Sequence, residues 1–344
     1  LVRDEKSSEL EYVLLIDMHH IISDGVSREI LSQEFTSLYN GQELAPLRLD
    51  YKDYAEWEQS KDQQLRISGH KRYWLDQYAE PAPVLELPTD YTRPAVQSFV
   101  GNSIDFEIGE KELAGLRLLG ESSGSTLYMV LLSVYTILLS KLSNEEDIVI
   151  GTVVAGRDHV DLEGMIGMFV RTLALRNYPI GSQGYMDFLE EVKRRTLVSF
   201  EHQAYPYEAL VDELNLARDT SRNPLFDALF AYQNFDQREA ALSEVDASSH
   251  ERAHIISKFD LSLSANSWEG GIVLSIEYAP SLFKEDTIRR FIGYFQRIVS
   301  AIVSDKEILL KEKPDAVICT GDLTQRAIIH VHHASPYDSP LIEF

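Results

Sequence analysis

Two adjacent histidines stand just before an acidic turn near the start of the chain. The seven residues from His19 to Gly25 read HHIISDG. An imidazole can accept or donate a proton near neutral pH. Asp24 is suited to an ion pair or to a hydrogen bond that fixes the turn, and Gly25 lets backbone approach closely. This pattern predicts proton transfer, or hydrogen-bond positioning, by a histidine.

The residues before this turn indicate which histidine faces the reaction. Tyr12–His20 alternates like a strand, so His19 and His20 should point to opposite faces. His20 shares its face with three apolar residues, Leu14, Ile16 and Met18. We expect this apolar wall to keep the His20 imidazole neutral and able to accept a proton or a hydrogen bond. His19 is expected to pack and to shape the loop.

Two plainer interpretations stay open at this point. Both histidines could be ordinary strand-end residues, with Asp24 as a turn former. His20 and Asp24 could instead bind a metal, but residues four apart share a face only on a helix, and the turn argues against a helix. We therefore predict no metal ligands in this segment.

The spacing of apolar residues predicts an α/β fold with a largely buried sheet. One helix is expected from an N-cap at Ser27 to Asn40-Gly41, with a buried side of Ile30, Leu31, Phe35 and Leu38. A long or broken helix is expected over Tyr51–Tyr78, with Trp57, Tyr73, Trp74 and Tyr78 as apolar anchors. Other helices are expected from 110 and at 127–142, 185–200, 207–214 and 284–303, with strands at 98–108, 147–154, 228–232, 261–265 and 272–278.

Composition limits the partners of this 344-residue chain. Its formal net charge of −23 repels phosphate backbones and anionic lipid, which argues against nucleic acid and membrane surfaces. The single cysteine, Cys319, excludes an intrachain disulfide and predicts a cytoplasmic protein. The Pro-rich stretch Pro81–Pro94 is the expected domain boundary.

Five motifs in order carry a resemblance to a known family. His19–Gly25 has the HHxxxDG form of condensation domains, epimerization domains and chloramphenicol acetyltransferase-like acyltransferases. Four further blocks resemble YxDYAxW, IGxFVNTLxxR, HQxxPFE and RDxSRNPLF, at 51–57, 166–176, 202–208 and 218–226. Together they resemble the condensation domains of nonribosomal peptide synthetases. Two positions depart from the pattern: Arg171 replaces the usual Asn, and Tyr207 replaces Phe.

The resemblance implies two chloramphenicol acetyltransferase-like lobes in a V shape, each a mixed sheet flanked by helices. Residues 1–90 would be the remainder of an incomplete N-terminal lobe that carries HHxxxDG. Residues 91–312 would be the C-terminal lobe, with a latch region around Lys258–Leu261. Residues 313–344 form an atypical tail, in which Gly321-Asp322 is a weak phosphoesterase-like pattern.

The resemblance also assigns chemistry to residues. His20 would be the catalytic residue, as a base or as a positioner of the acceptor amine. Asp24 would be structural and paired with an arginine, either Arg176 or Arg171. Asn223 would set a loop or donate a hydrogen bond near the tunnel.

The implied partners are peptidyl carrier proteins and neighbouring synthetase domains. No cofactor is expected to bind directly, because phosphopantetheine arrives on the carriers. The alternatives are an epimerization domain, and a truncated module that docks carriers without catalysis. The YxDYAxW-like and SRNPLF-like blocks favour condensation over epimerization.

Overall fold

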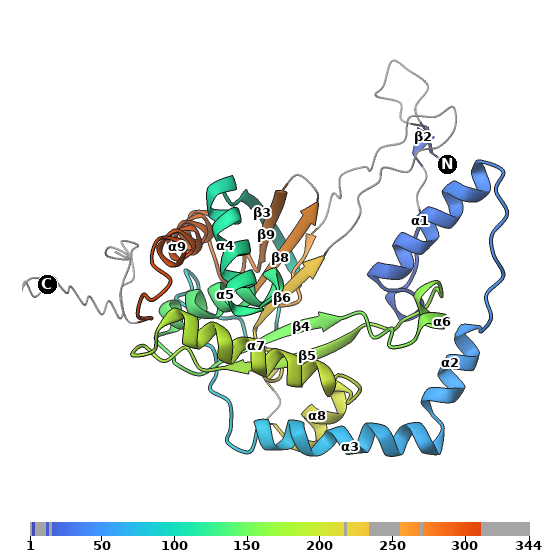
Figure 1. Cartoon of the computed structure of the whole chain (residues 1–344), viewed down its shortest axis with the longest axis horizontal. Coiled ribbons are helices and arrows are strands. Elements are labelled where there is room, and N and C mark those ends of the chain that lie inside the picture. Colours follow the sequence, from blue (N-terminus) through green and yellow to red (C-terminus); the bar gives the residue numbers. More distant parts are fainter. Residues whose placement is uncertain are drawn as a thin grey trace, which may run out of the picture.

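The computed structural model describes residues 2–3, 12–13, 16–216, 219–233, 255–268 and 271–310. Its centre is a mixed seven-stranded sheet in the order β5-β4-β6-β8-β9-β3-β7 (Figure 1). The strands are β3 (Val100–Glu107), β4 (Ile148–Val154), β5 (Arg171–Asn177), β6 (Ala228–Gln233), β7 (Ile255–Ile256), β8 (Leu261–Trp268) and β9 (Gly271–Tyr278). The pairs β4–β6 and β6–β8 are parallel, and the other pairs are antiparallel. This arrangement confirms the predicted α/β class.

A layer of helices packs against this sheet. The layer consists of α4 (Glu110–Ser123), α5 (Leu127–Ser143), α7 (Tyr185–Glu201) and α9 (Glu285–Ser304). In β9 every second side chain is buried, including Ile272, Leu274 and Ile276, as expected of a strand covered on one face. The helices contact one another as well as the sheet, so one continuous apolar core forms between the two layers.

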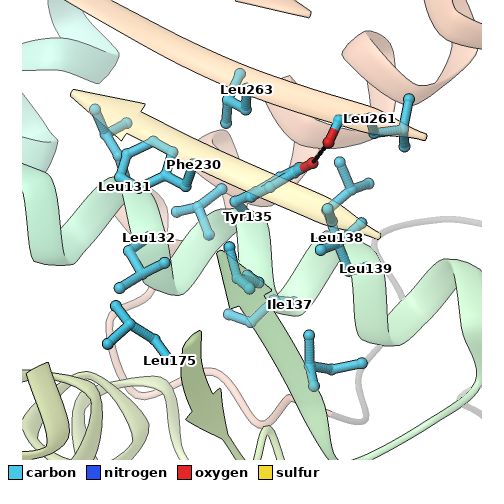
Figure 2. Packing of buried hydrophobic residues seen from close by; sticks show 14 of the residues in the cluster. Leu131, Leu132, Tyr135, Ile137, Leu138, Leu139, Leu175, Phe230, Leu261 and Leu263 are labelled. Atoms are coloured by element: carbon cyan, nitrogen blue, oxygen red, sulfur yellow. Dashed lines mark hydrogen bonds between the residues drawn. The ribbon is translucent and has the colours of Figure 1, made fainter. Parts of the chain in front are cut away.

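Helix α5 lies in the middle of that core because it is apolar on nearly every side. Thr126 caps its first turn by accepting a hydrogen bond from the backbone N–H of Met129. Figure 2 shows Tyr135 of α5 between the side chains of β6 and β8, where its hydroxyl donates to the carbonyl of Leu261 at 3.5 Å. Helix α5 contacts β4 and β6, so its burial holds these two strands in place.

Three helices form an arc outside the sheet layer (Figure 1). They are α1 (Gly25–Tyr39), α2 (Tyr51–Glu58) and α3 (Lys61–Gln77). The expected long helix over Tyr51–Tyr78 is indeed broken, since Ser60 caps the start of α3 by accepting from the backbone of Gln63. The arc is fastened at its far end, where α3 packs on α8 (Tyr207–Leu214). At the near end, α1 lies beside the short helix α6 (Val160–Glu163).

Several local expectations are wrong. The first helix begins at Gly25 with Asp24 as its N-cap, because the Asp24 carboxylate reaches the backbone N–H of Ser27. Phe35 and Leu38 are exposed rather than buried, since no described element covers that side of α1. Trp57 is 46% exposed and not an anchor, and the sequence pattern did not reveal strand β5.

The Pro-rich stretch over 81–94 packs closely against the sheet layer. Leu85 and Leu87 are buried in the main core, and Arg93 forms an ion pair with Asp260 at the start of β8. The placement of a domain boundary here, and of a latch at Lys258–Leu261, stays a prediction. The tail with Cys319 and Gly321-Asp322 lies outside the described residues. Among the described helices no single one is long and apolar enough to cross a bilayer, although α4 and α5 pass that test together across a bend of 108°.

Candidate active site

The HHxxxDG segment folds as a tight turn, not as the end of a strand. Strand β2 covers Tyr12–Val13 and pairs with β1 (Val2–Arg3). Residues 16–19 have no regular structure, and His20–Ile22 form one 3₁₀ turn. The expected strand through His20 is therefore wrong, as is the expected apolar wall. Ile16 is 52% exposed, His20 is exposed, and Leu14 lies outside the described residues.

The two histidines use the same ring nitrogen in opposite roles. His19 caps the turn, and its Nδ1 accepts a hydrogen bond from the backbone N–H of Ile21 at 3.1 Å. The Nδ1 of His20 lies 2.6 Å from the carbonyl oxygen of Ser23. Since a carbonyl can only accept, the His20 Nδ1 carries the proton. A neutral His20 ring therefore leaves the lone pair of Nε2 free to accept a proton or a hydrogen bond.

Asp24 is buried, with 3% of its surface exposed, and hydrogen-bond donors surround its carboxylate. This carboxylate accepts from the backbone and hydroxyl of Ser27, each at 2.8 Å, and from the backbone N–H of Phe169 at 3.0 Å. Burial raises the pKa of the Asp24 carboxyl, but these bonds and the charge of Arg157 outweigh burial and hold the pKa below its usual value. Asp24 is thus an ionised anchor for the start of α1.

The arginine that pairs with Asp24 is Arg157. Its Nη2 lies 3.1 Å from Asp24 Oδ1, and both side chains are almost fully buried. Its Nη1 donates to the carbonyls of Leu162 and Met165, and its guanidinium lies 4.2 Å from the ring centre of Phe169. A buried charge pair is stable only when such additional bonds satisfy both groups.

The predicted pairing of Asp24 with Arg176 or Arg171 is therefore wrong. Arg176, on β5, binds Asp147 at 2.6 Å and donates to carbonyls at and just after the end of α3, so it fastens α3 to the sheet. Arg171 binds Asp158 at 2.8 Å and lies 4.0 Å from Glu58 of α2. Each arginine thus forms its ion pairs with carboxylates other than Asp24.

A second, small apolar cluster supports this ion pair. Phe169 lies at its centre, with its ring 5.2 Å from that of Tyr51 and 4.7 Å from that of Tyr54. Tyr51 also donates to the carbonyl of Met168 at 2.9 Å. Gly167 has to be glycine, because a Cβ there would lie 2.1 Å from the Tyr51 ring. The YxDYAxW-like and IGxFVNTLxxR-like blocks thus meet at the HHxxxDG turn.

The other predicted site residues lie apart or act through the backbone. Gly25 is the first residue of α1. The Asn223 side chain donates a hydrogen bond to the carbonyl of Lys258 at 2.8 Å. Among the described residues it forms no hydrogen bond with the HHxxxDG turn. Its own loop is held by an ion pair of Arg222 with Asp227 at 2.7 Å. Asn223 therefore fastens the loop before β6, and a contact with substrate stays a prediction.

Sequence reasoning missed Arg157 and assigned Ser27 only the role of a helix N-cap. Arg157 follows directly after Gly156, whose φ of +65° and whose contact with the Phe169 carbonyl leave no space for a side chain. A glycine-arginine pair just after a buried strand is the signal that could have identified Arg157. Within the described ranges, no three histidine, cysteine or acidic side chains lie close enough to hold a metal ion.

The fold and site together define a class of acyltransferase-like domains with an HHxxxDG turn beside a helix-covered mixed sheet. The Condensation domain family model matches residues 5–313. Tyrocidine synthase 3 of Brevibacillus parabrevis is 45% identical over 307 residues, which is 89% of this chain and 5% of that protein. Gramicidin S synthase 2 of Aneurinibacillus migulanus is 45% identical over 302 residues, which is 88% of this chain and 7% of that protein.

Solved structures agree with this assignment at the level of the fold. The X-domain from teicoplanin biosynthesis superposes with a TM-score of 0.77 at 24% identity, covering 85% of this chain and 69% of that one. A four-domain nonribosomal peptide synthetase bound to AMP and glycine gives 0.75 at 24% identity, covering 86% and 24%. The chain therefore belongs to the condensation domain family of nonribosomal peptide synthetases.

A double-mutant cycle tests the corrected partner of Asp24. We expect Asp24→Asn and Arg157→Met to couple by about 1–3 kcal/mol in the free energy of unfolding, because each single change leaves the other charge buried and unpaired. Asp24→Asn with Arg176→Met should couple by about 0.5 kcal/mol or less, as expected of sites with no shared partner. The two coupling energies are measured by urea unfolding of the parent, the single variants and the two double variants. Equal coupling to the two arginines would contradict the pairing.

The pKa of Asp24 predicts an acid dependence. A carboxyl whose pKa is lower in the folded state stabilises the fold above its unfolded pKa, which is about 3.9, and loses that contribution as the pH falls through the folded value. The difference in unfolding free energy between the parent and Asp24→Asn should therefore be constant from about pH 5 to 8 and shrink below about 4. Urea midpoints measured over this pH range give the difference in unfolding free energy. The control is Asp105→Asn, at an exposed position. A difference that grows in acid contradicts the assignment.

Proposed function

We propose that this chain provides the condensation site of a nonribosomal peptide synthetase. It would join a donor aminoacyl or peptidyl thioester to the amine of an acceptor aminoacyl thioester, both carried on phosphopantetheine arms of carrier proteins. The chain spans only 5% of tyrocidine synthase 3 and 7% of gramicidin S synthase 2. The proposal therefore concerns the condensation step and not the activity of a whole synthetase.

The observation that carries the proposal is the geometry of His20. Its Nδ1 is held by the Ser23 carbonyl at 2.6 Å, so Nε2 is the nitrogen that can accept. The acceptor amine must be neutral and aimed at the thioester carbonyl carbon. In the reaction the new C–N bond forms, the C–S bond breaks, and the thiol leaves. Nε2 can support the attack in one of two ways. It can take a proton from the acceptor amine, or it can accept a hydrogen bond from an amine N–H and so hold the amine in place.

The support around His20 fits that role. Asp24 and Arg157 hold the turn from behind, and neither side chain is free to reach a substrate because both are buried. We infer that carrier proteins and adjacent synthetase domains are its partners, and that it works in the cytoplasm.

Exposure of the turn favours a second candidate function. Ile21 is 70% exposed and Ile22 is 57% exposed, so the described part of the chain does not enclose the reacting groups. Enclosure normally excludes water and strengthens the electrostatics of a site. A module that docks carrier proteins without catalysis therefore remains the alternative. Epimerization has no supporting contact, since no acidic side chain among the described residues forms a hydrogen bond or ion pair with His20.

Single-turnover formation of a dipeptide on two loaded carrier proteins tests the proposal. We expect product with the parent and a loss of about 100-fold or more in rate with His20→Ala, because an acid–base or positioning group contributes about that factor. His19→Ala, which removes the ring that caps the turn, should cost less. Mass spectrometry of the carriers reads the product.

The same assay separates the two candidates when it is run beside a measurement of carrier binding. Product that depends on His20 establishes condensation. Carrier binding without product contradicts the catalytic proposal and leaves the docking module.

A further inference from the structure

Ser27 is a fully buried hydroxyl that the proposed reaction does not use. It lies in the first turn of α1, and none of its surface is exposed. Four polar atoms surround its Oγ: Gly167 O at 2.7 Å, Asp24 Oδ1 at 2.8 Å, Gly167 N at 3.0 Å and Arg157 Nη2 at 3.0 Å. These atoms belong to three separate segments of the chain, so one hydroxyl joins all of them.

The bonding capacity of a hydroxyl fixes how this group works. Ser27 has one proton to donate and two lone pairs to accept with. The Gly167 N–H and the Arg157 guanidinium donate to the lone pairs, since both can only donate. The single proton is then shared between two acceptors, the Gly167 carbonyl and the Asp24 carboxylate. Every bonding position of the hydroxyl is therefore in use.

We propose that Ser27 is a positioning residue for His20. It holds the loop that contains Gly167 against the start of α1, and through Asp24 it holds the turn whose Ser23 carbonyl orients the His20 ring. Because it is buried, it contacts neither substrate. An effect of Ser27 on the reaction rate rests on the proposed function. The orientation of the His20 ring does not, because it can be measured in the protein without substrates.

Among the described residues, the Gly167 backbone forms hydrogen bonds only with the Ser27 hydroxyl, and the contacts beside it involve neighbouring residues of the loop. Tyr51 packs over the Gly167 backbone and bonds to the next carbonyl, that of Met168, at 2.9 Å. The Phe169 N–H bonds to Asp24 at 3.0 Å. Removal of the Ser27 hydroxyl therefore leaves both backbone groups of Gly167 buried without their partner, which is costly for any buried polar group. The loop should open locally more often.

The variant Ser27→Ala tests this in the full chain, with Ser133→Ala as the matched control. Ser133 is also fully buried, and its hydroxyl donates to Val130 O at 2.7 Å in helix α5, far along the chain from the site. We expect hydrogen exchange of the Gly167 amide to speed up roughly tenfold in Ser27→Ala and to be unchanged in Ser133→Ala at equal global stability.

The second readout reports on His20 itself. In ¹⁵N-histidine NMR spectra, the ring nitrogens of His20 should move toward the shifts of a free histidine in Ser27→Ala and stay at the parent shifts in Ser133→Ala. Unchanged Gly167 exchange or unchanged His20 shifts in Ser27→Ala overturns the proposal. Because neither readout needs turnover, failure of the condensation assay would not affect this result.

Discussion

The site depends on one buried ion pair, between Asp24 and Arg157. The two residues are 133 positions apart in the chain, and both side chains are almost completely shielded from water. Burial of two charges is costly. Here hydrogen bonds satisfy the Asp24 carboxylate and both terminal nitrogens of Arg157, while the buried Arg157 Nε has no hydrogen-bond partner among the described residues. If either partner is removed, the other is left as an uncompensated buried charge. This interaction therefore fixes α1 and its preceding turn to the loop that follows β4.

That loop transmits the rigidity of the sheet to the histidine. Strand β4 is buried between β5 and β6, and Arg157 comes three residues after its end. The chain returns to the sheet at Arg171, the first residue of β5. The segment between these strands carries Phe169 and Gly167, which contact α2 and α1. His20 is thus positioned by a sheet with which it shares no hydrogen bond in the described residues.

The sequence indicated the elements well where one periodic pattern decided the outcome. The apolar run in α5 and the alternation in β9 each depend on burial against a neighbouring layer, so spacing alone was informative. It also led to the right family, because five motifs occur in order. Spacing alone could not identify the partner of Asp24, since the two residues are 133 positions apart, and only the glycine just before Arg157 sets it apart from Arg171 and Arg176. The strand predicted through His20 failed for a related reason: alternation shows what a strand would bury, but pairing decides whether it forms.

The orientation of the His20 ring is the most direct test of the account. The chain holds ten histidines, so a spectrum of ¹⁵N-labelled histidine compared with that of His20→Ala identifies the ring. For the uncharged form of the ring, we predict a protonated Nδ1 and an unprotonated Nε2 for His20. A proton on Nε2 would mean that the Ser23 carbonyl does not hold the ring, and it would contradict the proposed role of Nε2 in amide formation.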